Sequence, residues 1–307
     1  MAVEPENVYF FLMNPLFKTN RTLNCRGRLI DLSVPKVMGI INTTPDSFYE
    51  GSRQTDLKAI VSQAEKMLSQ GATFIDVGGY SSRPGSTNIS IEEEELRVLP
   101  AINAIIKEFP NAFISVDTFR SAIAEKAADA GACMVNDISG GQLDSNMFAT
   151  IAKLQVPYVL MHMRGNPQTM AQQTQYDDLI KDIMDYFHPK IHQLNRLGVK
   201  DCIVDVGFGF SKTPEQNFQL LDCLSYYQLL EKPLLVGLSR KSMIWRTLKT
   251  DADHALNGTT ALHVVALQKG ASILRVHDVK EAMETIELVE KMNAAHKQNL
   301  KQAELNH

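Results

Sequence analysis

Basic side chains stand at the ends of a series of short apolar runs, where they could bind an anion together. Arg83, Arg240, Lys241, Arg275 and His277 all occupy such positions. Arginine can hold a phosphate through two parallel hydrogen bonds, and lysine adds a compact positive charge. One such residue alone is more often a solvated surface side chain. Five in equivalent positions predict a site for phosphate or pyrophosphate.

Two carboxylates occupy the same kind of position. Asp117 and Asp205 end apolar runs, where an ionised group needs donors if it is buried. A heterocycle with an amino-pyrimidine edge offers N–H donors, and Asn136 can both donate and accept. The alternative is a salt bridge to Lys241 inside the fold, and the two interpretations are compatible.

Aromatic and apolar residues inside polar loops suggest a second, aromatic ligand. Phe48, Pro84 and Phe210 lie in loops otherwise made of turn-forming residues, although core packing explains any one of them equally well. His162 follows a strand-like run but is better explained as a packed or rim histidine than as a catalytic one.

The apolar runs that precede these residues are short enough for buried strands, and helical patterns separate them. The expected strands cover 37–41, 73–77, 112–116, 132–135, 158–161, 202–204, 233–236 and 271–274. Eight strand–helix alternations in one chain predict a (β/α)8 barrel, in which all the strand ends meet on one face. A doubly wound open sheet would carry a glycine-rich dinucleotide fingerprint after its first strand, and the sequence has none there.

The chain divides into three expected parts. Residues 1–35 form an N-terminal extension that includes a hairpin between Leu23 and Leu32, with Arg26-Gly27 at its turn. Residues 36–292 form the barrel. Residues 293–307 form a polar tail that we expect to fray.

Composition narrows the class of protein. The chain has 307 residues, 44% hydrophobic and 21% charged, with a net charge of -4, which is typical of a globular protein and gives no basic block for nucleic acid. No run approaches the roughly 18 apolar residues of a membrane span, and the N-terminus lacks a signal-peptide pattern. The cysteines lack zinc spacing and are expected to be reduced, which predicts a cytoplasmic protein; they are Cys25, Cys133, Cys202 and Cys223.

The ordered set of motifs resembles the dihydropteroate synthase family of the folate pathway. The motifs are NTTPDSF at 42–48, DVGGYSSRPG at 76–85, SVDT at 115–118, NDISGG at 136–141, DVGFGFSK at 205–212, GLSRKS at 237–242 and RVHDV at 275–279. Any one of them is modest support, but the set in this order is highly specific.

The resemblance implies that 4-aminobenzoate condenses with 6-hydroxymethyl-7,8-dihydropterin diphosphate, with Mg²⁺ as cofactor, to give 7,8-dihydropteroate and diphosphate. It implies a pterin site of Asp117, Asn136, Asp205 and Lys241, and a diphosphate site of Asn42, Arg83, Arg275 and His277, with Asn42 on the metal. It implies an aminobenzoate site of Phe48, Ser82, Pro84, Phe210, Lys241 and Ser242. The residues expected to act in catalysis are Lys241, Asp205, Arg275 and His277. A homodimer is also implied, with no nucleic-acid or membrane partner.

The sequence departs from the family pattern at several positions. Tyr80 replaces a usual Glu, Ser82 a usual Thr and Val206 a usual Pro, and an Arg that often precedes the Gly258-Thr259 pair is absent. Two alternatives therefore stay open: a pterin-binding methyltransferase barrel that serves a corrinoid protein, and a catalytically silent pterin-binding module. For the synthase we expect a dissociative, SN1-like step, because a dihydropterin can delocalise positive charge from its methylene group.

Overall fold

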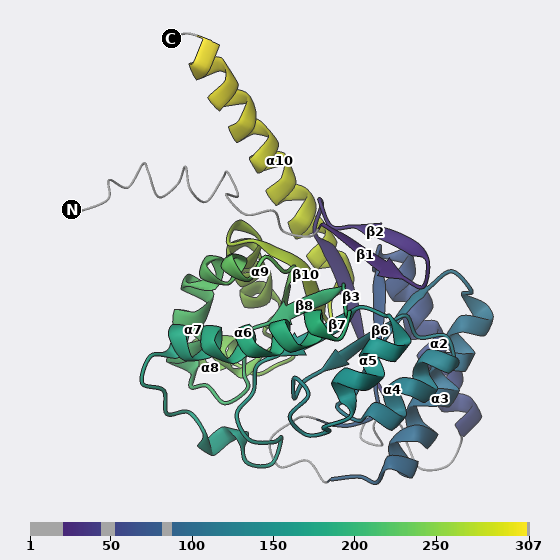
Figure 1. Ribbon diagram of the computed structural model, residues 1–307. Coiled ribbons are helices and arrows are strands. Elements are labelled where there is room, and N and C mark those ends of the chain that lie inside the picture. The colour runs from purple at the N-terminus through teal and green to yellow at the C-terminus, as the bar shows by residue number, and fades with distance from the viewer. Residues whose placement is uncertain (1–20, 44–52, 82–87, 306–307) are drawn as a thin grey trace.

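The computed structural model describes residues 21–43, 53–81 and 88–305. Its centre is a closed barrel of eight parallel strands in the order β10-β3-β4-β5-β6-β7-β8-β9 (Figure 1). The barrel strands are β3 (Lys36–Asn42), β4 (Phe74–Gly78), β5 (Phe113–Asp117), β6 (Met134–Asp137), β7 (Tyr158–Met161), β8 (Cys202–Asp205), β9 (Leu234–Val236) and β10 (Ala271–Val276). The predicted (β/α)8 barrel is confirmed.

Helices surround the barrel and cover its outer surface (Figure 1). The α-helices are α2 (Arg53–Ser69), α3 (Ile91–Glu108), α4 (Ser121–Asp129), α5 (Met147–Leu154), α6 (Leu179–Arg196), α7 (Pro214–Asp222), α8 (Ser242–Thr247), α9 (Leu256–Gln268) and α10 (Val279–Leu305). Two 3₁₀ turns, η2 (Met170–Gln172) and η3 (Leu224–Leu230), lie in the connections. Side chains at helical spacing bury one face of each helix against the outward residues of the strands, as Ile183 and Phe187 of α6 do.

Capping residues fix where several helices begin. Ser90 accepts a hydrogen bond from the backbone N–H of Glu93 at the start of α3. Thr213 and Gln216 form a reciprocal capping box at the start of α7, with Pro214 in its first turn. These caps set the points at which the loops before α3 and α7 end.

The predicted N-terminal hairpin is present and closes the far end of the barrel. Strands β1 (Thr22–Cys25) and β2 (Arg28–Asp31) pair antiparallel across a turn in which Arg26 and Gly27 both have positive φ, of 56° and 85°. The buried side chains Leu23 and Ile30 belong to the same apolar cluster as the lowest inward layer of the barrel, which includes Phe74. The barrel is therefore plugged at the amino ends of its strands.

The C-terminal segment differs from the expected polar tail. Helix α10 continues to Leu305, beyond Met292 where we expected it to fray (Figure 1). Residues 293–305 are rich in Ala, Lys, Gln, Leu and Glu, all good helix formers, and this composition favours continuation of the helix. No helix in the described part of the chain is long and apolar enough to cross a membrane.

Candidate active site at the carboxyl ends of the strands

Successive residues of a strand alternate between its two faces, so every second residue points into the barrel. Near the carboxyl ends of the strands these inward residues are polar. Asp76 pairs in register with Ser115, and Asp117 pairs with Asn136. Phe74, two residues before Asp76, belongs to the apolar layer below. The candidate site therefore begins where the interior changes from apolar to polar.

Arg275 of β10 joins two carboxylates from other strands. Its Nε donates to Asp76 Oδ2 at 2.6 Å, and its Nη2 donates to Asp117 Oδ2, also at 2.6 Å. Burial raises the pKa of Asp117, and the positive charge of Arg275 opposes that rise. We predicted Arg275 for the diphosphate end of the site, and the structure brings it directly onto the predicted pterin carboxylate.

Asp76 is the site residue that the sequence reasoning missed. It is fully buried, and its Oδ2 also accepts a hydrogen bond from Asn136 Nδ2 at 2.9 Å. Asp76 lies inside the apolar run Phe74–Gly78 and not at its end, so the search for charged residues after strands passed over it. The sequence did contain a signal for it: Asp76 is two residues from Phe74 and two from Gly78, so all three point into the barrel.

Asp205 is the last residue of β8, and Lys241 is the last residue of the loop between β9 and α8. Asp205 Oδ1 accepts from the backbone N–H of Gly207 at 2.8 Å, and burial raises the pKa of this carboxyl while Lys241 opposes the rise. Lys241 Nζ donates to the Phe208 carbonyl and lies 4.5 Å from the centroid of the Phe210 ring. Burial lowers the pKa of Lys241 to about 8. Among the described residues the alternative salt bridge from Lys241 to Asp117 or Asp205 is not formed.

Lys212 is a buried lysine that also binds the loop after β8. Lys212 Nζ donates to the carbonyls of Gly207 and Phe210 at 3.0 Å each, and it lies 3.1 Å from His162 Nδ1. His162 is buried, packs edge-on against Tyr186 with ring centroids 4.8 Å apart, and has its pKa lowered by burial. It is therefore a packed histidine that supports the loop, as expected.

The remaining predicted residues lie around the rim. Asn42 ends β3 with an exposed side chain, and Ser242 begins α8 next to Lys241. His277 is exposed, and its Nδ1 lies 3.2 Å from Ser239 Oγ. Phe48, Ser82, Arg83 and Pro84 lie outside the described residues.

Arg240 was wrongly included in the cation cluster. Its Nε and Nη2 bind the two carboxylate oxygens of Asp278 at 2.7 and 2.8 Å, and its Nη1 binds the carbonyls of Ala252 and Asp253. With these donors engaged by protein acceptors, Arg240 ties the loop after β9 to the loop before α10. Of the predicted cluster, the basic side chains that the structure describes at the mouth and that remain candidates are Lys241, Arg275 and His277.

Tyr80, which replaces the usual Glu, is buried at the end of β4. Its hydroxyl accepts a hydrogen bond from Gln168 Nε2 at 2.7 Å, and its ring meets Phe119 edge-on at 4.9 Å between centroids. At this position a packed aromatic side chain thus replaces a charged one, and its hydrogen bond connects the end of β4 to the loop after β7. Val206 is buried too, in the apolar core between the strands and helices.

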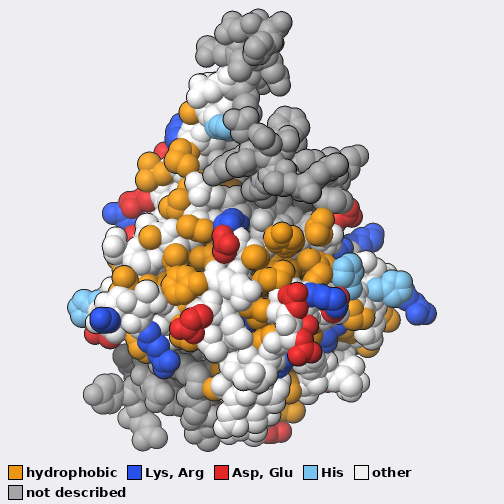
Figure 2. All heavy atoms as spheres, turned by 90° about the vertical axis from the view of Figure 1, so that its left-hand side faces the viewer, with side chains coloured by type: hydrophobic (Ala, Val, Ile, Leu, Met, Phe, Trp, Pro, Cys, Tyr) orange, Lys and Arg blue, Asp and Glu red, His pale blue; other side chains and the backbone are white. Residues whose placement is uncertain are grey.

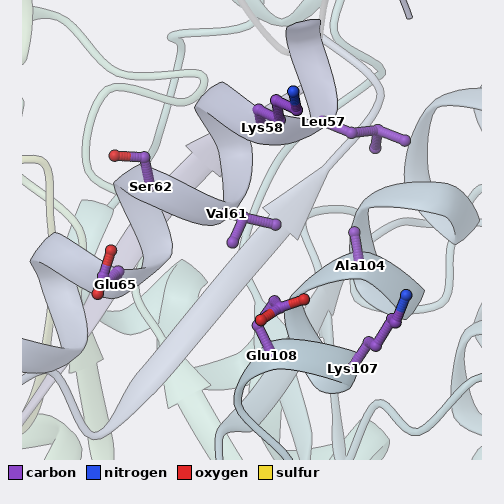
Figure 3. A pocket seen from close by; sticks show the side chains of 8 residues that line it. All are labelled: Leu57, Lys58, Val61, Ser62, Glu65, Ala104, Lys107 and Glu108. Atoms are coloured by element: carbon purple, nitrogen blue, oxygen red, sulfur yellow. The ribbon is translucent and has the colours of Figure 1, made fainter. Parts of the chain in front are cut away.

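A surface groove lies elsewhere, between α2 and α3 (Figure 3). Its cavity volume is about 410 Å³, and Leu57 and Val61 of α2 point towards α3 while Lys107 and Glu108 form its other wall. None of the predicted site residues that the structure describes lines this groove. It is therefore separate from the mouth of the barrel.

The described residues contain no group of three or more His, Cys, Asp or Glu side chains placed to hold a metal ion. Asn42 does fit Mg²⁺ in kind, because it offers a carboxamide oxygen at the rim. Mg²⁺ usually takes few protein ligands and completes its shell with water and substrate phosphate oxygens.

Comparisons with known proteins agree on one family. The model of the family described as pterin binding enzyme matches residues 38–277. The dihydropteroate synthase of Escherichia coli (strain K12) is 42% identical over 270 residues, which cover 87% of this chain and 95% of that protein. A Yersinia pestis dihydropteroate synthase solved with a sulfonamide drug complex superposes with a TM-score of 0.83 at 42% identity, covering 89% of this chain and 99% of that one. The Xanthomonas albilineans dihydropteroate synthase solved with 4-aminobenzoic acid superposes with a TM-score of 0.83 at 35% identity, covering 90% of this chain and 99% of that one.

Proposed function

The chain belongs to the pterin binding enzyme family and acts as a dihydropteroate synthase, and we propose that the polar mouth of its barrel binds both substrates. In this reaction the amine of 4-aminobenzoate forms a bond to the methylene carbon of 6-hydroxymethyl-7,8-dihydropterin diphosphate. The C–O bond to the diphosphate breaks with its electrons on oxygen, and the new secondary amine loses a proton. The observation that carries the assignment of the site is the convergence of Asp117, Asn136 and Asp205, all acceptors, beside Lys241 and Arg275.

The pterin ring binds to the inner part of this mouth, against Asp117, Asn136 and Asp205. The oxygen Oδ1 of Asn136 is buried and has no hydrogen-bond partner among the described residues, so it is available to a ligand donor. Buried acceptors that are satisfied only by a matching ligand discriminate strongly against ligands without those N–H groups. This arrangement supports a heterocycle rich in N–H donors.

Aminobenzoate binds further out, against Phe210, Lys241 and Ser242. The negative charge of Asp205 stabilises the Lys241 ammonium, which also lies over the Phe210 ring. Lys241 therefore adjoins both proposed binding regions. A protonated Lys241 would attract the carboxylate of aminobenzoate. Phe48, Ser82 and Pro84 remain predicted members of this pocket.

The diphosphate end is assigned to Asn42, Arg275 and His277, together with the predicted Arg83. Asn42 would hold Mg²⁺, which when bound supplies positive charge to the oxygens of the leaving group. Arg275 presents a guanidinium that two carboxylates orient, and a fixed cation stabilises developing negative charge without reorganising.

A dissociative step suits this environment. Asp117 and Asp205 are negative groups next to the ring on which positive charge would develop, and the arylamine is a neutral nucleophile that needs little activation. A secondary deuterium isotope effect near unity at the pterin methylene would contradict this part of the proposal.

A second copy of the chain is the proposed partner. Apolar side chains gather across the middle of the face in Figure 2, over the side of the barrel where α7, α8 and α9 lie in Figure 1. Leu248, directly after α8, is 53% exposed. A large exposed apolar patch marks an interface, and two-fold dimers are the commonest oligomers. Sedimentation of the wild-type chain and of Leu248→Lys tests this: a wild-type monomer at micromolar concentration would rule the dimer out.

The cytoplasm is the proposed location, to be tested by cell fractionation.

A coupled assay of pyrophosphate release tests the function. Release that requires both the dihydropterin diphosphate and 4-aminobenzoate supports the synthase. Methyl transfer from a methylated pterin without pyrophosphate release would favour the methyltransferase barrel, and pterin binding without any turnover would favour the silent module. Complementation of a folate-requiring strain that lacks its own synthase gives an independent readout in cells.

A further inference from the structure

Asp76 lies at the centre of the polar layer, and the assignments above give it no role beyond its ion pair with Arg275. It is fully buried in β4, and its Oδ2 accepts hydrogen bonds from Arg275 Nε on β10 and from Asn136 Nδ2 on β6. One oxygen atom therefore ties three strands together beneath the substrates.

The polarity of these contacts constrains both partners. In its ion pair with Arg275, the Asp76 carboxylate accepts hydrogen bonds and donates none. The amide of Asn136 must then turn Nδ2 towards Asp76, which leaves Oδ1 as the atom that it offers elsewhere. The orientation of an amide is set by such networks, so removing the carboxylate would permit the opposite orientation.

The polar atoms around Asp76 indicate that this layer of the barrel interior binds a ligand. Asp76 Oδ1, Ser115 Oγ and Asn136 Oδ1 are all buried and without a hydrogen-bond partner among the described residues. They come from three adjacent strands, and Asp76 and Ser115 are partners in register. Unsatisfied buried polar atoms are costly and are found where function requires them.

We propose that Asp76 is a positioning residue of the synthase: by accepting from Asn136 and Arg275, it fixes which atoms these two residues present to the substrates. The inference rests on the proposed function, which assigns Asn136 to the pterin and Arg275 to the diphosphate. Asp76 acts through these partners, so its effect on pterin affinity must depend on Asn136.

A double-mutant cycle tests this dependence. The variants are Asp76→Asn, Asn136→Ala and the two combined, and the measurement is calorimetric titration with 6-hydroxymethyl-7,8-dihydropterin. Each single change is expected to raise the dissociation constant roughly tenfold, and the double variant should bind within about twofold of Asn136→Ala alone. Additive losses, or unchanged affinity in Asp76→Asn, would overturn the inference.

Asp137→Asn is the matched control. Asp137 is also fully buried, one residue after Asn136 and on the opposite face of β6, where it accepts from the Tyr158 hydroxyl at 2.7 Å and from the backbone of Ser139 and Gly141. We expect Asp137→Asn to lower the unfolding temperature and to leave pterin affinity within about twofold of wild type. An equal loss of affinity in this control would show that any buried carboxylate gives the effect and would overturn the inference.

The wild-type chain offers a measurement that does not depend on how a variant folds. The side-chain amide protons of Asn136, assigned by their loss in Asn136→Ala, should exchange with water about as slowly as those of Asn217, which is equally buried and donates from Nδ2 to the Thr213 carbonyl at 2.7 Å. Faster exchange at Asn136 would overturn the inference. A wild-type chain that bound no dihydropterin would instead overturn the proposed function, and amide exchange would still report on Asp76 separately.

Discussion

Lys212 and Lys241 both donate to carbonyls of the same short segment of backbone, Gly207 to Phe210. Lys212 Nζ donates to the carbonyls of Gly207 and Phe210, and Lys241 Nζ donates to the carbonyl of Phe208 between them. Burial lowers the pKa of both amines, to about 7 for Lys212 and about 8 for Lys241. The loop after β8 is thus held by two lysine side chains, and Lys241 is the one that we propose adjoins aminobenzoate.

Lys241→Ala should lower kcat/KM at least roughly tenfold, or about 1.4 kcal/mol in transition-state stabilisation, because an ammonium adjoining both substrates is lost. Steady-state kinetics with each substrate varied in turn would measure it. Near-normal kinetics would remove Lys241 from the site.

The apparent KM for 4-aminobenzoate should rise with pH above about 8, the pKa of Lys241. Burial depresses this pKa, so the amine loses its proton and its attraction for a carboxylate at a lower pH than an exposed lysine would. The measurement is KM between about pH 7 and 9 at saturating dihydropterin diphosphate. Lys241→Arg is the control, since arginine stays protonated and should give a flat profile over this range.

Asp205→Asn should weaken dihydropterin binding by roughly tenfold and leave 4-aminobenzoate binding nearly unchanged, because an acceptor-only group becomes a mixed donor and acceptor. Calorimetric titration with each ligand separates the two effects. Equal losses for both ligands would contradict the assignment of Asp205 to the pterin.

Gly207→Ala should destabilise the fold more than Gly198→Ala does. Both glycines have positive φ, of 73° and 83°, but a Cβ at Gly207 would lie 2.0 Å from the carbonyl oxygen of His162, whereas nothing lies within 4 Å at Gly198. The shared backbone strain costs about 1 kcal/mol, and the clash should add a further 1–3 kcal/mol or so at Gly207 alone. Urea unfolding of both variants would measure the difference, and equal midpoints would refute it.

Asn42→Ala should raise the Mg²⁺ concentration that gives half-maximal activity by roughly tenfold, since a proposed oxygen ligand is removed. Activity titrated with MgCl₂ would measure it, and thermal unfolding without metal would serve as the control for folding. An unchanged Mg²⁺ requirement would exclude Asn42 as the ligand.

The sequence predicted the barrel well because each strand is a short apolar run followed by turn-forming residues. The strand Tyr158–Met161 has the predicted bounds, and β10 extends the predicted strand by two residues. Contacts between distant residues could not be predicted in the same way. The partner that engages Arg240 is Asp278, and the acceptor for Asn136 is Asp76, in a different strand. Patterning gives the face on which a residue lies, but the pairing of side chains across the barrel depends on strand tilt and register.

The hairpin that plugs the barrel has a kinetic consequence. Because β1 and β2 fill the lower end, both substrates and both products must use the opening at the strand ends. The side chains proposed to bind the pterin, such as Asn136 at 2% exposure, are more deeply buried than the half-buried Lys241 and Ser242, which are proposed to bind aminobenzoate. A molecule seated at the outer position would then obstruct entry to the inner one. We therefore expect 4-aminobenzoate to act as an inhibitor when it arrives first, and turnover at high aminobenzoate concentration to slow.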